Sequence, residues 1–132
     1  MAPQPEGGHI VFISSVSASY ASVGTAAYGA AKAGVNSLGR TLSVEWAPKV
    51  RVNVLTAGFV LTEQTELHYG ADGGDAVAAT IPMGRMAVPS DIGDGVLLLS
   101  SEYAGFITGA NLLVHGGGER PVFHDAVATT KA

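Results

Sequence analysis

Apolar residues along the chain are concentrated in short runs that predict strands. The segment His9–Ser14 contains the continuous apolar run IVFI, and further strands are predicted over Val50–Leu55 and Thr108–His115. Continuous apolar runs are typical of parallel strands that are buried on both faces. The pattern therefore predicts a parallel sheet that includes these three strands.

Two segments between the predicted strands have apolar residues at helical spacing. The longer helix is predicted over Ala26–Trp46, and Pro48 ends it. A second helix begins at Pro89, because proline suits the first position of a helix. The buried face of the longer helix is predicted to hold Val35, Leu38, Leu42 and the core anchor Trp46, and that of the second helix Ile92, Val96 and Leu99.

The remaining segments carry residues that form turns and loops. Residues 1–8 are rich in Pro and Gly and are predicted to be a flexible lead-in. Residues 9–118 form the folded domain, and residues 119–132 are predicted to be a loose tail. The weakly patterned segment Glu63–Thr80 is predicted to form short helical pieces on a mobile loop. Strands that alternate with helices predict an α/β fold.

Composition describes a globular protein and excludes several classes of function. Hydrophobic residues make up 47% of the 132 residues and charged residues 14%, which is unlike a disordered chain. The net charge of −4 and the scattered Lys and Arg residues argue against a nucleic-acid-binding surface. The chain has no cysteine, and its apolar runs are too short to cross a membrane, so we expect a soluble cytoplasmic protein.

Three polar residues have a spacing that suits proton transfer. Ser15 ends the first apolar strand, and Tyr28 and Lys32 stand four residues apart on one face of the predicted helix. A lysine ammonium one turn away favours the ionised form of a phenol by Coulomb attraction. Such a phenol can donate and accept a proton, while the serine hydroxyl orients a substrate oxygen. A tyrosine and a lysine at this spacing also occur often by chance on ordinary helices.

Five motifs extend the pattern over most of the chain. In order they are ISS (Ile13–Ser15), YGAAK (Tyr28–Lys32), RVNVLTAGFVLTE (Arg51–Glu63), IPMGRMAVPSDI (Ile81–Ile92) and ITGANLLVHGG (Ile107–Gly117). With these motifs the span Gly8–Gly117 resembles the C-terminal half of the short-chain dehydrogenase/reductase (SDR) family. The resemblance implies a partial Rossmann-like, doubly wound parallel sheet, which consists of the last three strands and their helices without the first half.

The resemblance also implies an activity and a site. Proteins of this family are NAD- or NADP-dependent oxidoreductases that interconvert a small carbonyl compound and an alcohol by hydride transfer. By resemblance the catalytic residues are Ser15, Tyr28 and Lys32, with Tyr28 as the general acid and base. The cofactor contacts implied are Tyr28, Lys32, Gly58, Val60 and Thr62. Relatives are commonly oligomers, so a homo-oligomer is expected.

The chain also departs from the family pattern. It has no glycine-rich turn for the cofactor pyrophosphate, no residue that selects NAD or NADP, and no counterpart of the family's catalytic asparagine. Ala57 replaces a proline of the family, and His115 replaces an aspartate. Thr62 could equally be a helix N-cap, and four histidines without paired spacing predict no metal site. The alternative function is a non-catalytic remnant or an interaction module that pairs with another polypeptide.

Overall fold

Three parallel strands form the centre of the structure, and two long helices cover them. The computed structural model describes residues 7–70, 72 and 74–118. The expectations for residues 1–6 and 119–132 therefore lie outside the described residues. The elements in chain order are β1 (Gly8–Ser15), η1 (Val16–Ala18), α1 (Ala26–Glu45), β2 (Val50–Ala57), α2 (Thr65–Tyr69), α3 (Asp75–Ala78), α4 (Pro89–Ser100), η2 (Glu102–Ala104) and β3 (Asn111–Val114).

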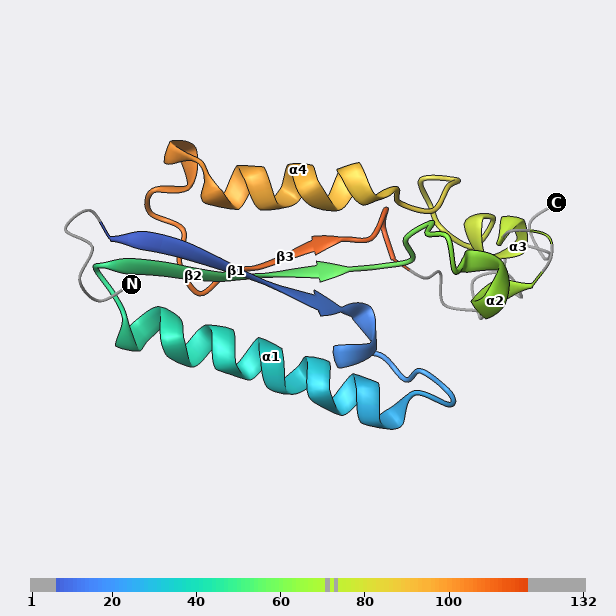
Figure 1. Ribbon diagram of the computed structural model, residues 1–132, viewed down its shortest axis with the longest axis horizontal. Helices are drawn as coiled ribbons and strands as arrows, with labels where there is room; N and C mark the ends of the chain where they lie inside the picture. Colours follow the sequence, from blue (N-terminus) through green and yellow to red (C-terminus); the bar gives the residue numbers. More distant parts are fainter. Residues whose placement is uncertain (1–6, 71, 73, 119–132) are drawn as a thin grey trace, which may run out of the picture.

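The sheet has the order β1, β2, β3, and both pairings are parallel. Figure 1 shows α1 on one face of the sheet and α4 on the other, with α2 and α3 beyond the carboxyl ends of the strands. This arrangement confirms the predicted α/β, Rossmann-like fold with three parallel strands. The register pairs Ser15 with Ala57, and Ala57 with Val114. The three carboxyl ends therefore meet at one edge, where ligands of such sheets bind.

The central strand β2 forms the core of the structure. Val54 and Leu55 are at most 2% exposed, and as neighbours in a strand they point to opposite faces of the sheet. A Cβ on Gly39 of α1 would lie 2.5 Å from Val54 Cγ2, and a Cβ on Gly95 of α4 would lie 2.7 Å from Leu55 Cδ1. The two glycines therefore let the helices approach β2 closely from both sides.

The buried face of α1 differs from the prediction. The helix ends at Glu45, and Trp46 is 40% exposed, so its predicted role as a core anchor is wrong. Leu38 is 47% exposed, whereas the small residues Gly39 and Ser43 are buried. Because the close approach to β2 is made by small residues, the large side chains at the edges of this face remain in solvent. None of the described helices is long and apolar enough to cross a membrane.

The last strand is shorter than predicted, because it covers Asn111–Val114 and not Thr108–His115. At Thr108 the side chain takes the place of a backbone hydrogen-bond partner of β2, since Val52 N–H donates to Thr108 Oγ1 at 3.1 Å. Gly109 N–H then donates to Val52 O at 2.7 Å. The chain therefore reaches β3 through a bonded turn.

Asn53 connects β2 to this turn and gives a test of the fold. Its side chain is fully buried, donates to Ile107 O at 2.9 Å and accepts from Ala110 N–H at 3.0 Å. Asn53→Leu removes both bonds and leaves the Ala110 amide unpaired, so the free energy of unfolding should fall by about 2–3 kcal/mol. Urea unfolding followed by circular dichroism measures this loss. The exposed Ser37→Ala variant is the control, and a loss below about 0.5 kcal/mol would contradict the prediction.

Candidate active site

Ser15 lies where β1 ends and forms the N-cap of the short helix η1. Its Oγ accepts a hydrogen bond from Ser17 N–H at 3.3 Å. Because Oγ accepts this bond, its own hydrogen can still be donated to a substrate oxygen. The neighbouring Ser14 is buried, and its Oγ donates to Lys32 O at 3.3 Å. The two adjacent serines therefore have different surroundings, and Ser15 is the one at the edge of the sheet.

Tyr28 and Lys32 lie together on α1 and are held against the end of β1. Lys32 Nζ lies 5.6 Å from the centre of the Tyr28 ring and donates to Ile13 O at 2.9 Å. With the bond from Ser14 to the Lys32 carbonyl, two hydrogen bonds now link one residue of α1 to β1. The Tyr28 side chain is 49% exposed, so its phenol is accessible to a ligand.

The carbonyl that Lys32 binds lies on the open edge of the sheet. Gly8 N–H donates to Lys49 O at 3.0 Å and therefore points toward the β2 side. Backbone groups of successive residues in a strand point alternately to the two sides, so those of Ile13 point away from β2. Since β1 has no second neighbour among the described strands, the Lys32 ammonium satisfies an edge carbonyl.

Gly29 sets the distance between α1 and the turn after Ser15. A Cβ on Gly29 would lie 2.7 Å from Ser17 O, closer than real Cβ contacts come. A larger residue there would push the first turn of α1, which carries Tyr28, away from η1. The glycine of the tyrosine motif therefore lets the first turn of α1 lie against the turn that follows Ser15.

Gly58 and Val60 belong to the chain that leaves β2. A Cβ on Gly58 would lie 2.7 Å from His115 Cβ, so only glycine fits beside the end of β3. Val60 lies opposite Ala87 in an isolated parallel β-bridge, and the residues on either side of Val60 make its hydrogen bonds. Ala87 N–H donates to Phe59 O at 2.9 Å, and Ala87 O accepts from Leu61 N–H at 2.8 Å. The amide and carbonyl of Val60 itself therefore point away from Ala87.

Thr62 lies three residues before α2 and is not its N-cap, which is Gln64. The N–H of Thr62 donates to Thr65 Oγ1 at 2.7 Å, and its Oγ1 accepts from Gln64 N–H at 3.3 Å. The hydroxyl hydrogen of Thr62 can still be donated, because Oγ1 acts as the acceptor in that bond. The interpretation of Thr62 as a helix cap is therefore wrong, although the residue does stabilise the turn before the helix.

These groups fit the carboxamide of a nicotinamide. A carboxamide offers one acceptor oxygen and two N–H donors. Val60 presents a backbone donor and acceptor that have no partner among the described residues, and Thr62 adds a hydroxyl donor beside them. Because these groups follow Gly58 on one loop at the carboxyl edge, Gly58, Val60 and Thr62 could hold the nicotinamide end of NAD or NADP.

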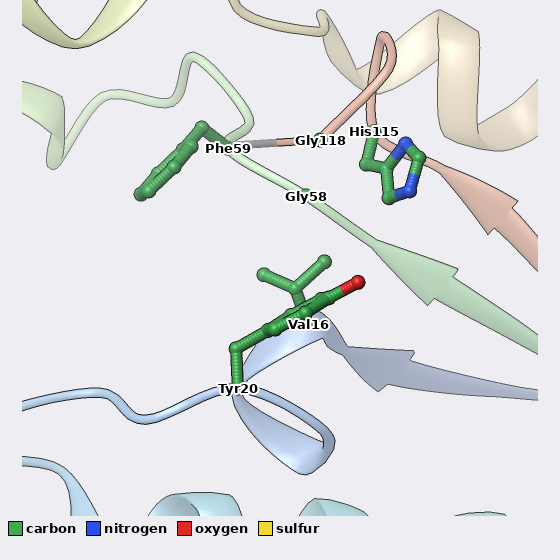
Figure 2. Close-up of a pocket in the computed structure, with 6 residues that line it drawn as sticks. All are labelled: Val16, Tyr20, Gly58, Phe59, His115 and Gly118. Carbon is green, nitrogen blue, oxygen red and sulfur yellow. The ribbon is translucent and has the colours of Figure 1, made fainter. Parts of the chain in front are cut away.

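A small cavity lies between the strand ends. It is lined by Val16 and Tyr20 after β1, by Gly58 and Phe59 after β2, and by His115 and Gly118 after β3. Figure 2 shows Val16 and Tyr20 on the opposite side of this cavity from Phe59 and His115. Sequence reasoning did not place Val16, Tyr20 or Phe59 in the site. Their position in the sequence could have indicated them, because each follows the end of a predicted strand by a few residues.

A second, larger cavity of about 140 Å³ shares Phe59 and His115 with the first. Its remaining lining is mostly apolar and consists of Ile81, Met83, Arg85, Ala87, Asp91, Val114 and Gly116. The two charged residues pair with each other through two hydrogen bonds of 2.7 and 3.0 Å. The hydrogen bonds from Arg85 and from Val88 N–H lower the pKa of Asp91 to about 2. The wall of this cavity is therefore mostly apolar, and its two charged side chains are paired with each other.

The fold and the family comparison together define the class of protein. A family model described as enoyl-(acyl carrier protein) reductase matches residues 1–119. The chain belongs to the short-chain dehydrogenase/reductase family, which confirms the resemblance seen in its motifs and makes it a member of an oxidoreductase family. No group of three His, Asp or Glu side chains that could hold a metal occurs in the described part of the chain.

Individual relatives show how much of the family domain is present. The acetoacetyl-CoA reductase of Allochromatium vinosum is 40% identical over 111 residues, which are 83% of this chain and 45% of that protein. The D-threitol dehydrogenase of Mycolicibacterium smegmatis is 38% identical over 112 residues, covering 84% and 43%. The structure of a gluconate 5-dehydrogenase from Burkholderia cenocepacia with NADP and tartrate aligns with a TM-score of 0.77 at 29% identity, covering 85% and 45%. The chain thus spans slightly less than half the length of these relatives.

The pair between Arg85 and Asp91 predicts a change in acid stability. Arg85→Gln removes the charged donor, so the pKa of Asp91 should rise from about 2 toward its ordinary value of 3.8. Because the folded-state pKa lies below the unfolded value, the pair stabilises the fold above pH 3.8 and this contribution is lost as the pH falls toward 2. A carbon-13 NMR titration of the Asp91 carboxyl measures the shift, with Arg40→Gln as the control. An unchanged Asp91 midpoint in Arg85→Gln would refute the prediction.

Proposed function

We propose that this chain supplies the proton-transfer half of an NAD(P)-dependent oxidoreductase that interconverts a carbonyl compound and an alcohol. The observation that carries the proposal is the position of Lys32, which lies over the Tyr28 ring and is hydrogen-bonded to β1 at Ile13 and Ser14, the two residues before Ser15. Membership of the family supports an oxidoreductase, and the relatives named above are a reductase and two dehydrogenases.

Each of the three side chains has a task in carbonyl reduction. The reduced nicotinamide, when bound, supplies a hydride to the carbonyl carbon. Ser15 donates its hydroxyl hydrogen to the carbonyl oxygen and holds it in place. Tyr28 gives its proton to this oxygen, and takes it back in alcohol oxidation. Lys32 stabilises the phenolate that remains, and its other ammonium hydrogens are available to the ribose of the cofactor.

The loop after β2 holds the nicotinamide end of the cofactor in this proposal. The backbone groups of Val60, which have no partner among the described residues, and the hydroxyl of Thr62 bind the carboxamide. Gly58 packs against His115 and contacts the nicotinamide end through its backbone. Together with Tyr28 and Lys32, these residues contact only the nicotinamide end, which is identical in NAD and NADP. Either cofactor therefore fits these contacts.

The open edge of β1 is where the rest of the domain would pair. Ile13 is 42% exposed there, and within the described part of the chain its outward carbonyl is bound only by Lys32. A groove of about 700 Å³ runs beside the start of the strand, between Ile10, Trp46 and Val50. We propose that a phosphate-binding half, in the same or another polypeptide, covers this edge. The same exposed edge supports the second candidate function, an interaction module without catalysis of its own.

We also propose that the assembled protein forms a homo-oligomer. Large apolar side chains are exposed on α4, on η2 and just after η2, namely Leu97, Leu98, Tyr103 and Phe106. Exposed apolar patches of this kind mark surfaces that associate. Helix α4 covers the opposite face of the sheet from α1, so association through α4 would leave Tyr28 accessible (Figure 1).

The role of Tyr28 is tested in a domain completed by the N-terminal half of the acetoacetyl-CoA reductase relative, fused before Gly8. Tyr28→Phe removes the transferable proton, so turnover of a carbonyl substrate with NADPH should fall by at least about 10³-fold. Tyr103→Phe, on a side chain that is 95% exposed, is the matched control and should keep full turnover. Retention of more than about a tenth of the activity by Tyr28→Phe would refute the proposed role.

Cofactor binding by the 132-residue chain alone separates the two candidate functions. The chain offers contacts only to the nicotinamide end, so we expect NADH and NADPH to bind with a Kd weaker than about 1 mM. Nucleotide fluorescence during a titration with the purified chain measures the affinity. Saturable binding in the micromolar range would contradict this expectation and would exclude the non-catalytic remnant.

A further inference from the structure

Phe59 and Tyr69 form an aromatic corner beside the candidate active site. Their ring centres lie 5.8 Å apart with an angle of 81° between the planes, the edge-to-face geometry that aromatic pairs prefer. Phe59 follows the end of β2, whereas Tyr69 ends α2. The corner therefore joins the sheet to the segment that lies over its carboxyl edge.

The position of Tyr69 is fixed by the contacts of α2. Thr65, the first residue of this helix, is 3% exposed and accepts a hydrogen bond from Thr62 N–H at 2.7 Å. On the other side, a Cβ on Gly74 would lie 3.8 Å from Tyr69 Cβ and 3.4 Å from Thr65 Cγ2. Tyr69 thus packs against the Gly74 backbone on one side, while 37% of its surface is exposed to solvent.

The aromatic corner also borders the space beside the end of β1. Phe59 lines the smaller cavity together with Val16, which follows Ser15 directly. Burial raises the pKa of Tyr69, and the charge of the Tyr28 phenol raises it further.

The larger cavity beside Phe59 has the size and lining of a site for one ring. Its volume is about 140 Å³, and an apolar cavity of about 150 Å³ is known to hold benzene. Most of the lining residues, among them Phe59, Met83 and Ala87, supply apolar surface. The polar lining consists of His115 and the ion pair of Arg85 and Asp91, whose two side chains are hydrogen-bonded to each other. A substrate with many hydroxyl groups would lose hydrogen bonds to water there and find few partners, which costs free energy for each buried group.

We propose that the substrate of the candidate oxidoreductase is a ketone, or the matching secondary alcohol, that carries a flat apolar group of about one ring, which packs on Phe59 in this cavity. Tyr69 is the specificity-determining residue that holds the Phe59 ring in place. The carbonyl end of the substrate points from Phe59 and His115 toward Val16, the residue after Ser15. This inference rests on the proposed function and adds the substrate class to it.

Titrations of the 132-residue chain test the substrate class without any turnover. The methyl signal of Met83, recorded by NMR in carbon-13 methionine-labelled protein, reports on the cavity. Acetophenone is the flat apolar probe, and 1,3-dihydroxyacetone is the polar probe of the same functional class. We expect saturable shifts with acetophenone and at least tenfold weaker binding of 1,3-dihydroxyacetone.

Three variants locate the binding site. Ala87→Leu fills the cavity and should weaken acetophenone binding at least tenfold, and Tyr69→Ala should weaken it at least threefold by releasing Phe59. Ser37→Ala changes an exposed residue of α1, a helix that does not line the cavity, and should leave binding unchanged. Thermal unfolding of each variant checks that it is folded.

The outcomes separate this inference from the proposed function. No saturable shift with acetophenone, equal affinity for the two probes, or full binding by Ala87→Leu would each overturn the substrate class. If acetophenone binds as expected but the completed domain reduces no carbonyl compound, the proposed function fails and the ligand class stands. If the completed domain reduces 1,3-dihydroxyacetone at least as well as acetophenone, the proposed function stands and the substrate class fails.

Discussion

The hydrogen bonds between Lys32 and the end of β1 are the interaction on which the candidate site depends. The ammonium binds Ile13 O at 2.9 Å, and the backbone carbonyl of the same lysine accepts from Ser14 at 3.3 Å. These two bonds fix how far along the strand the helix lies, and therefore which residues of α1 face the strand-end serine. A shift by one helical turn would place a different residue at the position of Tyr28, and the proton-transfer arrangement would be lost.

Glycine packing works together with these bonds. Gly29 lets α1 touch the turn after Ser15, Gly39 lets it approach β2, and Gly95 does the same for α4 on the opposite face. In an isolated helix glycine costs about 1 kcal/mol relative to alanine. Here an added Cβ at each position would meet an atom at 2.7 Å or less, so the cost in the helix is offset by close packing between the layers.

Much of this arrangement could be predicted from the sequence, because it depends on local patterns. The apolar runs predicted the strands, and the spacing of Tyr28 and Lys32 placed both side chains on one face of a helix. The exposure of Trp46 could not be predicted in this way, since helical spacing does not show how wide the buried face is. The aromatic pair of Phe59 and Tyr69 was also missed, because it joins separate elements and has no local pattern.

The open edge of β1 and the candidate site are parts of one surface. The carbonyl that anchors Lys32 belongs to the edge where a further strand would pair, so completion of the sheet and the position of the ammonium affect each other. In the proposed function, the site combines side chains held in place by this chain with a cofactor surface on the proposed phosphate-binding half. The chain covers 45% of the length of its acetoacetyl-CoA reductase relative.

A crystal structure of the completed domain with NADP and a bound ketone would show whether Tyr28 is placed to transfer the proton. We expect Ser15 Oγ and Tyr28 Oη both to lie within about 3.2 Å of the ketone oxygen, with Lys32 still against the end of β1. A structure in which α1 is shifted along the strand, or in which the Tyr28 hydroxyl points away from the ketone, would contradict this expectation.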